Sequence, residues 1–135
     1  MSDVRCVVVL NQDLTSGKAA NAAAVIALTL GQRHPGLVGH TLSDAHGQQY
    51  PGLIPVGIPV LSADNTQLRA LLARCREQQL DVVLFPREGQ MTVDYAAFAA
   101  AVSEVATGDL QHLGLGITGD KKALRKLTAS LKLFG

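Results

Sequence analysis

The chain has 135 residues, the length of one ordinary domain, and 47% of them are hydrophobic while 17% are charged. This composition is typical of a folded chain with one core and excludes intrinsic disorder. The formal net charge is +1, so no overall electrostatic attraction draws the chain to nucleic acid or to an anionic membrane. RNA binding would therefore need a local patch, and net charge gives it no support.

The cysteines and the apolar stretches bear on where the protein works. Cys6 and Cys75 fall in a predicted buried strand and on the apolar stripe of a predicted helix, outside any zinc-type spacing, so we expect reduced core thiols. The apolar run after Arg5 is too short for a secretory signal, and the stretch 19–30 is too short to span a bilayer. We expect a soluble cytoplasmic protein.

The chain opens with a continuous apolar and β-branched run, Cys6–Leu10, which predicts a strand buried on both faces. A helix of mostly small residues follows. Its start is expected at Thr15 or Ser16, whose hydroxyl groups could cap the first turn, and its end at Gly31, ahead of Pro35. Small side chains allow close approach, so we expect this helix to pack tightly on the first strand.

The middle of the chain is less regular. Loose alternation around a Gly-containing segment predicts a surface excursion or hairpin over 38–50. A short strand is expected over Val56–Leu61, and Pro59 assigns it an edge or an end position. The clearest amphipathic helix covers 65–79. Its apolar stripe consists of Leu68, Leu71, Leu72 and Cys75.

The second half continues the alternation of strands and helices. The predicted elements are a buried strand (Val82–Phe85), a polar loop (86–90), a helix (93–106), a strand (Leu110–Ile117) and a helix (120–130). Thr92 is expected to cap the helix that follows it, and Ser62 or Asp64 the helix before. The alternation predicts an α/β fold with a mostly parallel or mixed sheet of about four strands.

One motif matches the dinucleotide fingerprint by letter: Gly114-x-Gly116-x-x-Gly119. A true fingerprint opens a βαβ unit with an acidic residue about 20 positions further on, and too little chain follows Gly119. Leu113 and Leu115 alternate with the first two glycines. These glycines are therefore expected on one face of a strand, where a helix packs closely.

Gly17 and Lys18 suggest an anion site, although the full spacing of a phosphate loop is missing. A lysine at a helix start, near the carboxyl end of a buried strand, lies where free backbone N–H groups and the helix dipole favour an anion. The alternative is a solvated lysine paired with Asp13 or a neighbouring carboxylate. The sequence does not decide between the anion site and the solvated lysine.

Signs of metal or nucleophilic chemistry are weak. His40, Asp44 and His46 could form part of a metal set, but no fourth ligand is suggested, and we expect neither a metal nor another cofactor. No Gly-x-Ser-x-Gly elbow and no Ser/His/Asp or Cys/His set is visible.

The last predicted helix carries a basic face, formed by Lys121, Lys122, Arg125 and Lys126. Cations in a first helical turn oppose the helix dipole, so either Asp120 as a cap or an external phosphate is expected to offset them. The simpler interpretation, an ordinary solvated face, is preferred.

Two stretches resemble the type II peptidyl-tRNA hydrolases. Their opening is matched by Asp13-Leu14-x-x-Gly17-Lys18 between a Val-rich strand and a small-residue helix. Their final strand and helix are matched by Leu113-Gly114-x-Gly116, Leu124 and Leu127-Thr128-x-x-Leu131-Lys132-Leu133. The whole chain is still more similar to an uncharacterised bacterial family of this fold. That pattern comprises Asn11, Asp13-Leu14, Gly17, Ala20-Asn21-Ala22, Pro86 and Gly89-Gln90.

The resemblance implies a single domain over residues 1–135 with the peptidyl-tRNA hydrolase II-like fold, a three-layer sandwich with helices on both faces of the sheet. It also implies a homodimer, as hydrolases of this fold often form. The alanine-rich helices are the expected helix–helix or subunit contact.

The resemblance carries over only part of the hydrolase site. The hydrolases continue on the first helix with a second lysine, a glutamine and a histidine, where this chain has Ala20, Ala24 and Ala27. Their Asp-Ala-Gly loop corresponds to Arg87-Glu88-Gly89. Of that constellation Lys18 is kept, so hydrolysis by the usual residues is not expected.

Two functions from different classes follow. The preferred one is a small-ligand or interaction module that presents polar groups at the strand ends. Those groups belong to Asn11, Asp13, Gly17, Lys18, Asn21, Arg87, Glu88 and Gln90. The alternative is a hydrolase acting on an ester or amide of an anionic substrate, with Lys18 holding the anion and Asp13 or Glu88 as base.

Overall fold

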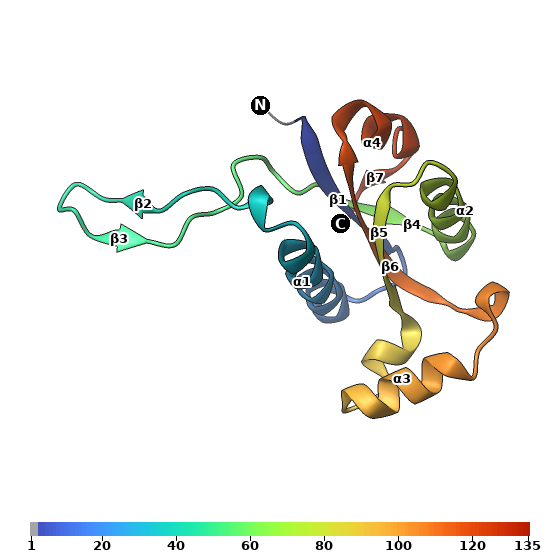
Figure 1. Cartoon of the computed structure of the whole chain (residues 1–135). Helices are drawn as coiled ribbons and strands as arrows, with labels where there is room; N and C mark the ends of the chain where they lie inside the picture. Colours follow the sequence, from blue (N-terminus) through green and yellow to red (C-terminus); the bar gives the residue numbers. More distant parts are fainter. Residues whose placement is uncertain (1–2) are drawn as a thin grey trace.

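The computed structural model describes residues 3–135, which form a mixed α/β fold around a five-stranded sheet (Figure 1). The strands are β1 (Val4–Asn11), β4 (Val60–Ala63), β5 (Asp81–Pro86), β6 (His112–Asp120) and β7 (Lys132–Leu133). They lie in the order β5-β6-β1-β4-β7. β1 pairs with β4 in parallel, and the other neighbours are antiparallel. The predicted mixed sheet is confirmed, with five strands rather than about four.

Helices cover both faces of this sheet. They are α1 (Ser16–Arg33), α2 (Asn65–Glu77), α3 (Tyr95–Ser103) and α4 (Lys121–Leu127), with short 3-10 turns η1 (Pro35–Leu37), η2 (Arg87–Gln90) and η3 (Thr107–Asp109). α1 packs with even-numbered residues of β1 on one face, and α2 and α4 pack with odd-numbered residues of β1 on the other. In the described part of the chain, no helix has the length and apolar character needed to cross a membrane.

The helix α1 packs closely on the strand β6. A Cβ atom at Gly116 would overlap the side chains of Ile26 and Leu30, and one at Gly114 would crowd Leu10 and Ile26. Ile26 and Leu30 are fully buried, so they have no free volume into which to move. The prediction that a helix packs closely on these two glycines is confirmed.

The helix ends are capped differently from the prediction in two cases. Thr15 precedes α1 without a side-chain capping bond, and α1 continues past Gly31 to Arg33 because His34 and Pro35 end it. Asp94, not Thr92, caps α3; the hydroxyl of Thr92 instead donates to the carbonyl of Glu88.

The caps of α2 and α4 follow the sequence. Asp64 and Gln67 form a reciprocal capping box at the start of α2. The Asp120 carboxylate accepts from the backbone N–H groups of Lys122 and Ala123, so this cap offsets the basic first turn of α4.

Two predicted elements differ in position or burial. The strand expected over Val56–Leu61 starts at Val60, directly after Pro59, because proline supplies no ladder donor. The helix expected over 93–106 is shorter, and none of its residues is buried. In Figure 1, α3 lies beyond the end of the sheet rather than on its face, and Tyr95 is 80% exposed.

The predicted excursion is a hairpin that projects from the body, and we call residues 39–53 the arm (Figure 1). Its base is closed by a bond from the Gly39 N–H to the Leu53 carbonyl, 2.8 Å long. Its short strands, β2 (Leu42–Ser43) and β3 (Gln49–Tyr50), pair only with each other. Gly47, with φ +80°, forms the turn between them.

Candidate functional site

The carboxyl edge of the sheet gathers most of the residues singled out from the sequence. β5 and β1 are both antiparallel to β6, and β4 is parallel to β1, so β1, β4 and β5 end at the same edge. α1 starts there, η2 follows β5 there, and β6 begins there, at the lower side of Figure 1. Open α/β sheets commonly bind ligands at such an edge.

Three of the predicted site residues are joined directly. The Gln90 side-chain amide donates to the backbone carbonyl of Lys18 over 2.9 Å and to Oδ1 of Asn21 over 3.1 Å. These bonds fix the η2 turn against the first turns of α1. The Lys18 side chain is exposed beside them.

The Asn11 side chain links the end of β1 to the start of β6 at this edge. Its Nδ2 donates to the carbonyl of His112 over 3.2 Å, and its Oδ1 accepts from the backbone N–H of Asp13 over 3.0 Å. Asp13 itself is exposed. Throughout residues 3–135 the ion pairs involve Asp81, so the alternative in which Lys18 pairs with Asp13 or another carboxylate is not formed.

Arg87 and Glu88 point to different parts of the edge. Arg87 donates from Nη1 to Oε1 of Gln111 over 3.0 Å, which turns its side chain toward the start of β6. Glu88 Oε1 is buried, and it has no hydrogen-bond partner among the described residues. Gly89 beside it packs so closely on the Phe85 ring that a Cβ atom there would overlap the ring. Glu88 thus carries a buried acceptor that no described residue satisfies.

His112 is the residue at this edge to which the sequence assigned no role. It is 2% exposed, and its Nδ1 atom is buried without a hydrogen-bond partner in the described chain. Burial lowers the pKa of this imidazole, and the positive charges of Arg69 and Arg76 lower it further, which favours the neutral form of the ring. A single histidine before a glycine-rich strand carried no spacing signal in the sequence.

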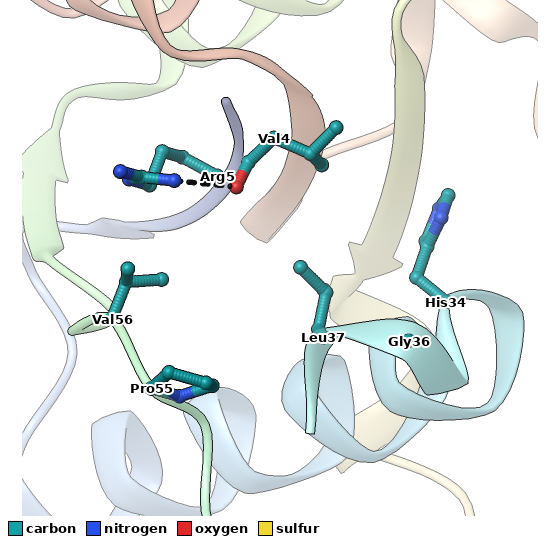
Figure 2. Close-up of a pocket in the computed structure, with 7 residues that line it drawn as sticks. All are labelled: Val4, Arg5, His34, Gly36, Leu37, Pro55 and Val56. Atoms are coloured by element: carbon teal, nitrogen blue, oxygen red, sulfur yellow. Dashed lines mark hydrogen bonds between the residues drawn. The ribbon is translucent and has the colours of Figure 1, made fainter. Parts of the chain in front are cut away.

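A cleft of about 490 Å³ opens at the opposite edge, where α1 ends and β1 begins. Figure 2 shows Leu37 on one side and Pro55 and Val56 on the other, with Arg5 near the start of β1. None of these residues was predicted as a site residue. They come from three distant segments with no shared motif, so no sequence pattern predicts this cleft.

Beside the cleft, Asp81 at the start of β5 holds the end of α1. It accepts from Arg33 Nε and Nη2 over 2.9 and 2.7 Å and contacts His34 Nε2 at 2.5 Å. The hydrogen bond from Arg33 is the main cause that lowers the pKa of Asp81 to about 2, and the bond from His34 adds to it.

The residues considered for metal or thiol chemistry have other partners. Asp44 accepts from the Tyr50 hydroxyl and from two backbone N–H groups of the arm's own turn, so it does not gather His40 and His46. No group of three His, Cys, Asp or Glu side chains within residues 3–135 is arranged to hold a metal ion. Burial raises the pKa of both thiols, that of Cys75 to about 11, so both are protonated core residues.

Comparison with known proteins gives a family and a fold. Residues 4–134 match the family described as "Protein of unknown function (DUF2000)". A solved structure of a protein of unknown function from Agrobacterium tumefaciens strain C58 superposes with a TM-score of 0.90, at 24% sequence identity, over 100% of both chains. No curated protein matches the chain. An uncharacterised family over nearly the full length is what the resemblance implied.

Proposed function

Because the chain belongs to the DUF2000 family of proteins of unknown function, its activity has to be inferred from its own residues, and we propose that it binds a small anionic ligand at the carboxyl edge of the sheet. The observation that carries the proposal is the pair of bonds from Gln90 to Lys18 and Asn21. They hold a polar loop against the start of α1, next to an exposed lysine.

The start of α1 is suited to an anion. α2, α3 and α4 each begin with an aspartate whose carboxylate accepts from the first turn. α1 has no side-chain cap and no acidic residue in its first turn. The backbone N–H groups near Gly17, together with the helix dipole and the Lys18 ammonium, therefore favour a negatively charged group.

We infer that the fold is that of the type II peptidyl-tRNA hydrolases and that the chain lacks most of the side chains that those hydrolases use for catalysis. The resemblance at both ends of the chain supports the first part. The second rests on Ala20, Ala24 and Ala27, which offer methyl groups where those hydrolases have polar residues. Binding without the usual catalysis is the simpler function for such a site.

One observation favours a second candidate, hydrolysis of an ester or amide of an anionic substrate. The buried, unpartnered Oε1 of Glu88 is an unsatisfied acceptor close to Gly89 and Gln90. A carboxylate in this state could take a proton from an attacking water. Asp13, the other candidate base, is exposed and has no comparable feature.

Titration with inorganic phosphate, followed by amide NMR, tests the binding proposal. The signals of Gly17 and Lys18 should shift with saturation, and Lys18→Ala should weaken the affinity about tenfold by removing one charge-assisted contact. Lys126→Ala, an exposed lysine of α4, is the matched control and should leave the titration unchanged. Shifts confined to α4, or equal affinities in both variants, would remove the start of α1 from the site.

Hydrolysis of a synthetic peptidyl-tRNA separates the two candidates. The binding proposal expects no turnover beside an active type II hydrolase. Turnover that disappears in Glu88→Gln would establish the second candidate instead.

A further inference from the structure

The arm exposes apolar side chains of the kind that another molecule usually covers. Every residue from 40 to 51 is exposed, and so are the large apolar side chains Leu42, Tyr50 and Leu53, the last to 70%. Two-stranded hairpins are at best marginally stable in water on their own. A projecting hairpin with exposed apolar side chains therefore indicates a partner surface.

A matching surface lies at the base of the arm. η1 leads into the arm, and Pro55 and Val56 follow it, so the two segments that carry the arm also form opposite walls of the cleft (Figure 2). The cleft walls are mainly apolar, with Leu37 among them. Each copy of the chain thus carries a projecting apolar arm directly beside an apolar cleft, which is the self-complementary arrangement that a twofold dimer requires.

The charges of the two surfaces are also complementary. Arg5 lines the cleft, its side chain donates to the carbonyl of Val4 over 3.0 Å, and it forms no ion pair with the described residues. The arm contains one carboxylate, Asp44, and neither lysine nor arginine. An arm in the cleft would bring the Asp44 carboxylate to the surface that carries Arg5.

We propose that two copies of this chain exchange arms, with the arm of each copy lying in the cleft of the other. The size is adequate, because the 15 residues of the arm and the seven that line the cleft together fall within the roughly 20–30 residues a side of a stable interface. The occupant of the cleft is thus a second copy of the chain. This inference is independent of the anion site, which lies at the other edge of the sheet.

Sedimentation equilibrium over a concentration series tests the exchange. The wild type should sediment at twice the mass of one chain, and the double variant Leu42→Asp/Leu53→Asp should dimerise at least about 100-fold more weakly, because buried carboxylates would replace apolar contacts. Val93→Asp is the matched control, since Val93 is 99% exposed and precedes α3, which lies away from the arm (Figure 1). It should dimerise like the wild type.

The cleft side is tested with Val56→Asp, which should also weaken the dimer about 100-fold. Both arm positions lie outside the core clusters, so circular dichroism should show unchanged folding of the arm variant. A wild type that is monomeric at every concentration would overturn the exchange. So would a dimer that survives the arm variant but separates in Leu28→Asp, because that outcome moves the interface to the outer face of α1.

Discussion

The α1–β6 contact and the arm use glycine in opposite ways. In the contact, Gly114 and Gly116 remove side chains so that α1 can touch the sheet. In the arm, Gly47 supplies a left-handed turn, and Gly52 passes so close to the Gly39 carbonyl that a Cβ atom would overlap it. The glycines of the α1–β6 contact create buried contacts, whereas the glycines of the arm allow a hairpin that is exposed to solvent. Stability should therefore reside in the body, which leaves the arm free to serve a partner.

The largest effect is expected from a side chain in the α1–β6 contact. Gly116→Val should destabilise the fold by about 3 kcal/mol, because its methyl groups would displace the buried Ile26 and Leu30. Urea unfolding measures this change. Gly31→Ala, on α1 itself, is the control, because a Cβ atom there meets nothing within 4 Å, and it should be neutral or stabilising. Equal losses in both variants would show that α1 does not depend on close approach.

A smaller effect is expected where α1 is joined to β5. The pKa of Asp81 is lowered to about 2, so its charge stabilises the fold above the unfolded pKa near 4, and this contribution is lost as the pH falls from about 4 to about 2. The pair is partly exposed, so solvent screening keeps this contribution small.

Asp81→Asn should remove this part of the acid dependence. Thermal unfolding between about pH 5 and about pH 2 measures it, because this range spans the folded and the unfolded pKa of Asp81. Asp109→Asn, an exposed carboxylate of η3, is the control and should keep the wild-type slope. If both variants keep that slope, Asp81 does not link α1 to β5 in solution.

Local pattern predicted the body better than the periphery. The apolar runs of β1, β5 and β6, the stripe of α2 and the glycines of β6 are all local signals, and the structure bears them out. The insertion of antiparallel β6 between β5 and β1 depends on long-range pairing, which periodicity does not encode. The length and the burial of α3 differ from the prediction, because an apolar composition does not show whether another element covers a helix.

The sites divide in the same way. Asn21 and Gln90 were predicted to lie in one site at the strand ends, because strand ends and helix starts can be located from sequence. In the structure a hydrogen bond joins their side chains. Arg33 and Asp81 meet from elements 48 positions apart, without a motif. The exposure of the arm was equally hidden, because alternation predicts a hairpin without showing whether the hairpin lies on the body.

The smallest effect is expected in the arm, and its dependence on concentration makes it informative. Leu53→Ser keeps the backbone bond to Gly39 and removes an exposed side chain, so in dilute solution it should change the free energy of unfolding by less than about 0.5 kcal/mol. At high concentration an exchanged dimer stabilises the wild type by mass action. The wild-type Tm should then rise with concentration while that of Leu53→Ser rises less. Parallel curves would mean that the arm contributes neither to the body nor to a dimer.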